Sequence, residues 1–261
     1  MSSLLQFNDD ASKRLMAMYL TSDMIEQRKQ IIEFMNLQPG ERALDVGSGP
    51  GFLASEIGEV VGSSGQVCGV DISETLLQVA RAHCARQPWV EFRNGDAARL
   101  PYPDSSFDIG ISTQVLEYVP DVNAVLLDLY RVLRSGGRVV LLDTDWDSIV
   151  WHSTDNARMH RILSIWEEHT ADARLPRTLS HKLLQSGFLI ESQQVIPMFN
   201  PVFDQNTFSN RLIDLIVSFV SDRKGISRTE AVAWAEDLRQ LGEKGEYFFS
   251  LNRYLFIATK P

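Results

Sequence analysis

The 261-residue sequence predicts an α/β protein built on a doubly wound, mostly parallel sheet. Two observations lead to this prediction. From about residue 41, short apolar runs alternate with segments of helical periodicity, which is typical of a parallel sheet with helices on both faces. Three of the apolar runs also lead into a carboxylate, and ligands of such sheets bind beyond the carboxyl ends of the strands.

The predicted elements follow in a regular order. Strands are expected at residues 42–46, 66–70, 90–93, 107–112 and 137–142, with helices at 52–61, 73–86 and 122–133 between them. Helices at 153–173 and 179–186, a strand at 188–196, an apolar loop at 197–203, helices at 207–222 and 228–241 and a strand at 247–258 follow. An earlier helix is expected from Met24 to about Asn36, with Ile25, Ile32 and Met35 on its buried face.

The most informative stretch follows the first predicted strand and reads Asp45-Val46-Gly47-Ser48-Gly49-Pro50-Gly51. Glycines suit a tight turn that a ligand approaches closely, because a Cβ atom would obstruct both the bend and the ligand. The helix behind the turn offers unpaired N–H groups to a polar ligand. The spacing differs from the G-x-G-x-x-G of dinucleotide folds, which would place a glycine where Phe52 stands.

Two further carboxylates follow neighbouring predicted strands. Asp71 ends the run 66–70, at the position where a doubly wound sheet usually binds the hydroxyls of a ribose. Asp96 lies just after the run 90–93. Carboxylates at the ends of three successive strands predict a nucleoside site.

This series of motifs resembles the class I S-adenosylmethionine-dependent methyltransferases, within them the branch of the ubiquinone/menaquinone and arsenite methyltransferases, over roughly residues 20–143. The resemblance implies a Rossmann-like sheet of seven strands, whose last strand is antiparallel and inserts between the fifth and the sixth. It implies S-adenosyl-L-methionine as the cofactor and S-adenosyl-L-homocysteine as the product.

The resemblance also assigns cofactor-binding residues. The methionine part would lie by the glycine turn, the ribose by the second strand end, the adenine by the third, and the transferable methyl near the end of strand 107–112. The residues so assigned are Asp45, Gly47, Ser48, Gly49, Gly51, Asp71, Ile72, Asp96, Ala97, Thr113 and Gln114. The leading segment is expected to fold over the cofactor through Tyr19, Met24 and Arg28, although Tyr19 and Met24 would equally suit core packing.

The sequence departs from several relatives of this family. Tyr118 stands where the run V-L-E-H-x-x-D has its histidine, so no catalytic role is carried over to that position. The Asn/Asp-Pro-Pro-Tyr/Phe run of many enzymes that methylate nucleic-acid bases is missing. The two cysteines, Cys68 and Cys84, fall in the cofactor half and are too few for an arsenic site. A small organic metabolite is therefore the expected acceptor, methylated on O, N or C by in-line displacement.

Three carboxylates and two indoles follow residue 142, and they are expected to lie just past a strand end and to form the acceptor pocket. The candidates for a general base are, in order, Asp145, His152 and Asp147. Trp146 and Trp151 would stack on a flat or cationic acceptor. The alternative is a solvated acidic loop with the two tryptophans as packing anchors.

The expected organisation has five parts. These are an N-terminal helical cap at 1–36, the cofactor-binding half of the sheet domain at 37–145, its second half with the acceptor loop at 146–196, a helical lid at 197–246 and the final antiparallel strand at 247–261. The lid is expected to enclose the acceptor, and an oligomer contact is the alternative. A homodimer is compatible with either.

The composition of the chain indicates which kinds of binding partner and which compartment to expect. The 25 basic and 34 acidic residues give a net charge of −9, which disfavours nucleic acid and anionic membranes. No apolar stretch reaches about 20 residues, so no membrane insertion is expected. Two cysteines suit a reduced, cytoplasmic protein. No metal is expected, because His160 and His169 are spaced too far apart to form a convincing pair of ligands.

Two other functions stay open on the sequence. One is an NAD-type dinucleotide-dependent oxidoreductase, which Phe52 disfavours. The other is a non-catalytic protein that binds a nucleoside on the same fold, for which the cofactor residues would be the same.

Overall fold

The computed structural model describes residues 16–261, which divide into two compact units. The sheet unit comprises residues 28–143, 175–195 and 254–261. The helical unit comprises residues 16–27, 144–174 and 196–253. Each unit has its own buried apolar core.

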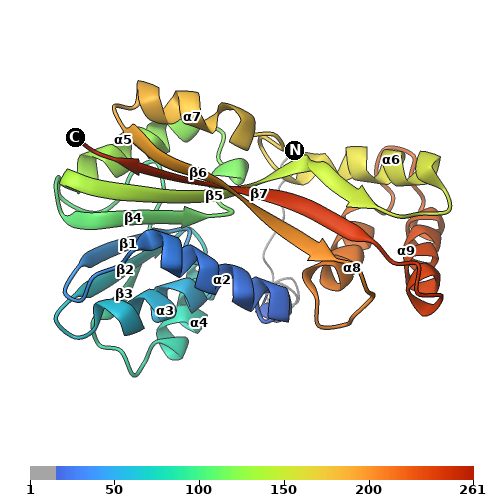
Figure 1. The fold of residues 1–261 in the computed structure, drawn as a ribbon, viewed down its shortest axis with the longest axis horizontal. Coiled ribbons are helices and arrows are strands. Elements are labelled where there is room, and N and C mark those ends of the chain that lie inside the picture. Colours follow the sequence, from blue (N-terminus) through green and yellow to red (C-terminus); the bar gives the residue numbers. More distant parts are fainter. Residues whose placement is uncertain (1–15) are drawn as a thin grey trace. The chain divides into compact units, whose positions relative to one another are not determined.

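The sheet has seven strands in the order β3-β2-β1-β4-β5-β7-β6 (Figure 1). Their bounds are β1 Arg42–Val46, β2 Gln66–Asp71, β3 Val90–Asn94, β4 Phe107–Thr113, β5 Leu133–Trp151, β6 Leu189–Asn200 and β7 Phe249–Thr259. The strands from β1 to β5 pair in parallel. The last strand runs in the opposite direction and lies between β5 and β6, which confirms the expected topology.

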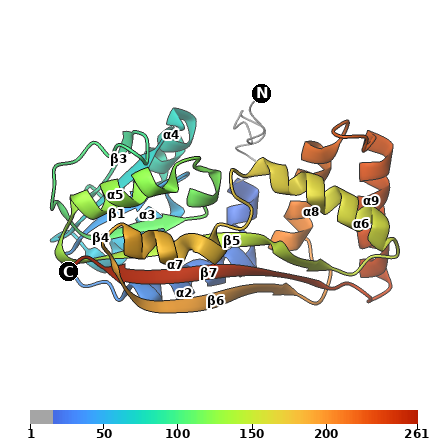
Figure 2. The ribbon, with the colours of Figure 1, turned by 90° about the horizontal axis from the view of Figure 1, so that it is seen from above.

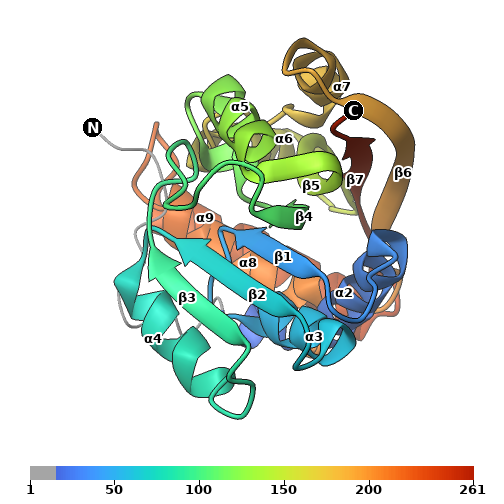
Figure 3. The same ribbon diagram turned by 90° about the vertical axis from the view of Figure 1, so that its left-hand side faces the viewer.

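Helices cover both faces of the sheet. Figure 3 shows α3 (Phe52–Val61) and α4 (Glu74–His83) on one face, with α5 (Val122–Val132) and α7 (Pro176–Gln185) on the other. Figure 2 shows α5 and α7 from above, on their common side of the strands. Local signals fix where these helices begin, since the Ser73 hydroxyl accepts a hydrogen bond from the Leu76 amide and Asp121 caps α5 in the same way.

The helix α2 (Ser22–Met35) buries a face that differs in part from the expected one. Met24, Ile31 and Met35 are buried, whereas Ile25 and Ile32 are only half-buried. Met24, Ile31 and Met35 are seven and four residues apart, which keeps them on one side of a helix with 3.6 residues per turn. The prediction is therefore confirmed for Met35 and wrong for Ile25 and Ile32, whose neighbours Met24 and Ile31 are buried instead.

Two strands are longer than expected. The strand predicted to end at residue 142 continues to Trp151, so the prediction that the acidic stretch lies just past a strand end was wrong. Asp143, Thr144 and Asp145 are buried within the strand, although their polar side chains interrupt the apolar pattern. Likewise β6 runs on to Asn200 in place of the expected apolar loop, because it lies at the edge of the sheet, where a proline such as Pro197 is tolerated.

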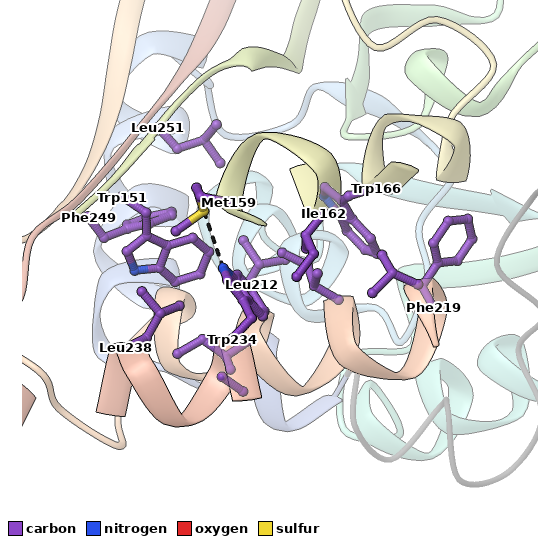
Figure 4. Close-up of a cluster of buried hydrophobic side chains, with 14 of the residues drawn as sticks. Trp151, Met159, Ile162, Trp166, Leu212, Phe219, Trp234, Leu238, Phe249 and Leu251 are labelled. Atoms are coloured by element: carbon purple, nitrogen blue, oxygen red, sulfur yellow. Dashed lines mark hydrogen bonds between the residues drawn. The ribbon is translucent and has the colours of Figure 1, made fainter. Parts of the chain in front are cut away.

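The helical unit contains α6 (Asn156–Trp166), α8 (Phe208–Val220) and α9 (Arg228–Glu243). Apolar and aromatic side chains from these helices pack with Trp151, Phe249 and Leu251 of the strands (Figure 4). Within this core the Trp234 indole N–H donates to the Met159 sulfur at 3.3 Å. The helix expected at 153–173 is shorter in the structure, where α6 is followed by a single 3-10 turn at Glu167–His169.

Within residues 16–261, no helix is both long enough and apolar enough to cross a membrane.

Candidate active site

Three glycines shape the turn between β1 and α3. Gly47, Gly49 and Gly51 have φ angles of 75°, 51° and 80°, in the left-handed region that residues with a Cβ rarely adopt. A Cβ on Gly47 would lie 2.1 Å from the Val115 side chain. A Cβ on Gly49 would meet no described atom within 4 Å, so the backbone at Gly49 borders open space.

Asp71 connects this turn to the end of β2. One carboxylate oxygen accepts the Gly49 amide at 2.8 Å, and the other accepts the Ser73 amide at 2.8 Å. Burial raises the pKa of Asp71, and these amide donors oppose that shift. Each oxygen retains a second lone pair for a donor such as a ribose hydroxyl.

Buried polar atoms line the same turn. The Asp45 carboxyl is buried, and its Oδ2 has no hydrogen-bond partner among residues 16–261. Burial, and next the charge of Asp71, raise the pKa of Asp45 to about 7. The hydroxyl of Ser48 is likewise buried without a partner in the described chain. Buried polar groups normally have partners, so both atoms fit a site for a polar ligand.

The end of β4 carries the residues expected near the reacting group. Thr113 and Gln114 are half-buried, and Gln114 has a positive φ of 57°. The backbone N–H of Gln114 donates to the Leu142 carbonyl at 2.6 Å, and this hydrogen bond connects the turn to β5. An L-residue held in the left-handed region costs about 1–3 kcal/mol and is commonest at functional sites.

A methyltransferase domain model matches residues 44–141, which span the glycine turn, Asp71 and Gln114. Residues 44–141 therefore form a methyltransferase domain. The demethylmenaquinone methyltransferase of Staphylococcus epidermidis is 41% identical over 117 residues, which is 45% of this chain and 48% of that protein. The chain spans about half the length of the first curated relatives that it matches.

Solved structures agree with the methyltransferase fold. A methyltransferase from Bacillus halodurans, described as putative, superposes with a TM-score of 0.62 at 22% identity, over 90% of this chain and 99% of that one. The phosphoethanolamine N-methyltransferase 2 of Haemonchus contortus, in complex with S-adenosyl-L-methionine, gives 0.63 at 21% identity, over 98% and 58%. At these identities the likeness establishes the fold alone.

The remaining residues that were assigned to the cofactor differ in how far they are exposed to solvent. Ile72 is 79% exposed directly after Asp71. Asp96 is exposed and accepts the Ala98 amide at 2.9 Å, and Ala97 beside it is half-buried. These positions form one stretch at the carboxyl ends of β2 and β3, which is the edge expected for the nucleoside.

The three residues of the leading segment that were expected to contact the cofactor lie in different units. Tyr19 and Met24 pack in the core of the helical unit. Arg28 lies in the sheet unit, where its guanidinium donates to Glu56 at 3.0 Å and lies over the Phe52 ring at 5.4 Å. Arg28 therefore joins α2 to the helix that follows the glycine turn.

The three candidate bases all belong to the helical unit. Asp145 is buried and accepts the Asp147 amide at 3.2 Å. Asp147 is exposed and forms an ion pair with Arg174 at 3.3 Å. His152 is exposed, and its amide donates to the Phe248 carbonyl at 3.1 Å. Among residues 16–261 no three acidic, His or Cys side chains could hold a metal ion.

One pair of buried acidic residues was not recognised from the sequence. Glu117 and Asp143 are both fully buried in the sheet unit, and a carboxylate oxygen of Asp143 accepts the Glu117 amide at 3.2 Å. The signal in the sequence was that Glu117 comes shortly after the apolar strand β4 and Asp143 directly after the apolar run of β5, and these strands are neighbours.

Proposed function

We propose that the protein methylates an O, N or C atom of a small organic molecule, using S-adenosyl-L-methionine. The observation that supports this most is the glycine turn: two buried polar atoms of its residues, Asp45 Oδ2 and Ser48 Oγ, have no hydrogen-bond partner among residues 16–261, and the backbone at Gly49 borders open space. When bound, the cofactor would supply an electrophilic methyl group on a sulfonium, for in-line transfer to the acceptor atom with the neutral thioether as the leaving group.

The residues of the turn would bind the cofactor by complementary chemistry. Asp45 would accept hydrogen bonds from an ammonium group, whose positive charge would favour the ionised carboxylate that burial disfavours. Asp71 holds the Gly49 amide and would accept from the ribose. The protein forms no covalent bond to the substrate in such a reaction, so much of the rate acceleration comes from holding the acceptor atom in line with the methyl group.

The helical unit would hold the acceptor, with α8 and α9 as its lid. A neutral hydroxyl or a protonated amine would need a base, and Asp145 is the first candidate because it is buried. Asp147 pairs with Arg174 at the surface, and His152 is exposed, so both rank lower. A contact between copies of the chain is the alternative role for this unit.

Ligand-induced thermal stabilisation tests the cofactor. Melting curves would be recorded with S-adenosylmethionine, S-adenosylhomocysteine and NAD(H) in parallel. A ligand at about 100 times its dissociation constant adds about 2.7 kcal/mol, which raises the melting temperature by several degrees. We expect a shift with the two sulfur nucleosides. A shift with NAD(H) alone would contradict the proposal.

Methyl transfer from radiolabelled cofactor to a panel of acceptors tests the reaction. The panel includes a reduced naphthoquinone and phosphoethanolamine, because related proteins are named for such acceptors. With an active acceptor, Asp145→Asn is expected to lower turnover about 10²-fold or more. Asp214→Asn, which removes an exposed ion pair with Arg239, is the matched control. Cofactor binding without turnover on any acceptor would instead favour a nucleoside-binding protein.

The cellular setting and the partners stay predictions. Cys68 and Cys84 are both buried free thiols, which supports a reducing compartment such as the cytoplasm. The negative net charge supports a small-molecule acceptor over nucleic acid. Light scattering of the purified protein would decide between a monomer and a homodimer.

A further inference from the structure

The side chain of Asn94 connects the end of β3 to the end of β2. Asn94 is the last residue of β3, and it pairs in register with Asp71, the last residue of β2. The side-chain NH₂ group of Asn94 donates to the Asp71 carbonyl at 3.2 Å and to the Ile72 carbonyl at 2.9 Å. The amide has two N–H groups, so it can serve both backbone carbonyls at once.

These hydrogen bonds strengthen the sheet where its backbone pairing ends. The strand β3 is an edge strand with β2 as its neighbour, so its end is held from one side of the sheet (Figure 3). The Gly95 amide also donates to the Asp71 carbonyl, at 3.1 Å. Ile72 lies beyond the last residue of β2, and the Asn94 side chain binds its carbonyl. Asn94 therefore extends the contact between the two chain segments by one residue.

Asp71 is held on both sides by this arrangement. Its carboxylate accepts the Gly49 amide and the Ser73 amide, each at 2.8 Å, while its carbonyl accepts the Asn94 side chain. The Asn94 amide thus acts directly on Asp71 and Ile72, which are two of the residues assigned to the nucleoside part of the cofactor. None of the motifs found in the sequence includes Asn94.

We propose that Asn94 is a positioning residue for the nucleoside, because its amide holds the ends of β2 and β3 in one arrangement. Asp71 and Ile72 belong to one of these ends, and Asp96 follows Asn94 on the other. Side chains from both ends can then meet one ligand with less ordering left to occur on binding. The effect on cofactor affinity rests on the proposed function, whereas the contact itself can be tested on the free protein.

The contact requires a hydrogen-bond donor at position 94. Carbonyl oxygens only accept, and so does an ionised aspartate, so Asn94→Asp would place carboxylate oxygens against two carbonyl oxygens at nearly unchanged shape. Asn94→Ala removes the donor and adds no repulsion. Asn94→Gln keeps the NH₂ group on a longer side chain, for which the exposed position leaves room. If the role is donation, Asn94→Gln is the mildest change and Asn94→Asp the most severe. A role of shape alone would make Asn94→Asp the mildest.

Hydrogen exchange of the free protein reports the contact without a ligand. The amides of Ser73 and Gly95 donate to Asp71, so the peptides that contain them show whether the end of β2 stays ordered. We expect exchange there to be about ten-fold faster in Asn94→Asp, about three-fold faster in Asn94→Ala and near the wild type in Asn94→Gln. Asn123→Asp is the matched control, because it makes the same chemical change at an exposed position in α5, and it should leave these peptides unchanged.

The exchange experiment has a clear contrary outcome. Wild-type exchange in both Asn94→Asp and Asn94→Ala would overturn the proposal. If Asn94→Asp does not fold, the comparison of Asn94→Ala with Asn94→Gln decides, and equal exchange in these two would overturn the donor role.

Calorimetric titration with S-adenosylhomocysteine reports the effect on the nucleoside site. We expect binding about ten-fold weaker in Asn94→Asp, about three-fold weaker in Asn94→Ala, and near the wild type in Asn94→Gln and Asn123→Asp. Wild-type affinity in Asn94→Asp would overturn the positioning role, and so would weaker binding in Asn94→Gln than in Asn94→Asp. Failure of the wild-type protein to bind would contradict the proposed function instead, and the exchange experiment would still decide the role of the Asn94 contact.

Discussion

An alanine at Gly49 is predicted to separate cofactor binding from folding. The Cβ of Gly49→Ala would enter the space beside the turn, where no described atom lies within 4 Å. The protein itself would therefore accommodate it at the cost of the left-handed backbone alone, which is about 1–2 kcal/mol. If the cofactor occupies that space, the same Cβ also overpacks the site, at about 1–3 kcal/mol of binding free energy.

These magnitudes translate into two measurements. Backbone strain of about 1–2 kcal/mol lowers the melting temperature of a chain of this size by about 2–8 °C. Overpacking of about 1–3 kcal/mol weakens binding of S-adenosylhomocysteine by about 5–150-fold, since each 1.4 kcal/mol is ten-fold. Melting curves and calorimetric titration of Gly49→Ala measure the two effects separately.

Two other glycines serve as controls. Gly62 has a φ of 66°, and a Cβ added there would also meet no described atom within 4 Å, but Gly62 ends α3, away from the turn. Gly62→Ala should therefore lose at least as much stability, because the φ and ψ of Gly62 (66° and −174°) lie in a region that is nearly restricted to glycine, and it should keep wild-type affinity. Gly47→Ala meets Val115 and should lose more stability than either. Wild-type affinity in Gly49→Ala would refute the placement of the cofactor at this turn.

Three other changes test further parts of the structure. Asp71→Ala leaves the Gly49 and Ser73 amides without their acceptor, so affinity for S-adenosylhomocysteine should fall about ten-fold or more in a calorimetric titration. Burial lowers the pKa of His169 to about 3, below its value of about 6.5 in the unfolded chain. Between these values the unfolded chain binds a proton that the folded protein does not, so the free energy of unfolding falls as pH decreases from about 6.5 towards 3. Urea unfolding at pH 7 and pH 5 should therefore show a smaller loss of stability in His169→Phe than in the wild type. Trp234→Ala empties the core of the helical unit and should cost about 3–5 kcal/mol in guanidinium unfolding, and a cost below 1 kcal/mol would contradict that core.

The cofactor half of the fold was predictable because its signals are local. Alternating strands and helices, a glycine turn with positive φ angles and carboxylates at or near the ends of β1, β2 and β3 are fixed by neighbouring residues, and β1, α3 and β4 have nearly the expected bounds. Asp71 lies next to the glycine turn, as its place after β2 implied. The roles of these residues toward a ligand stay predictions.

The second half depended on tertiary contacts that no local pattern contains. Asp143 and Asp145 look like a solvated strand end in sequence, yet both are buried in β5. Their burial depends on what packs around them, such as the Glu117 backbone amide that donates to Asp143. Pro197 suggested a loop, but only the sheet order shows that it lies on an edge strand. The division of the chain into two cores has no sequence signal of its own.

The route of the chain limits how the protein can be cut or recombined. The boundaries between the units fall within α2, β5, β6 and β7 and just before α7, so the helical unit is assembled from three separate stretches of sequence. A truncation that removes one unit would break continuous strands and leave unpaired backbone in the other. Exchange of the helical unit between relatives would need several junctions placed in mid-strand. If the helical unit holds the acceptor, as proposed, changes of acceptor are easier to reach by substitutions within this unit than by shuffling it as a module.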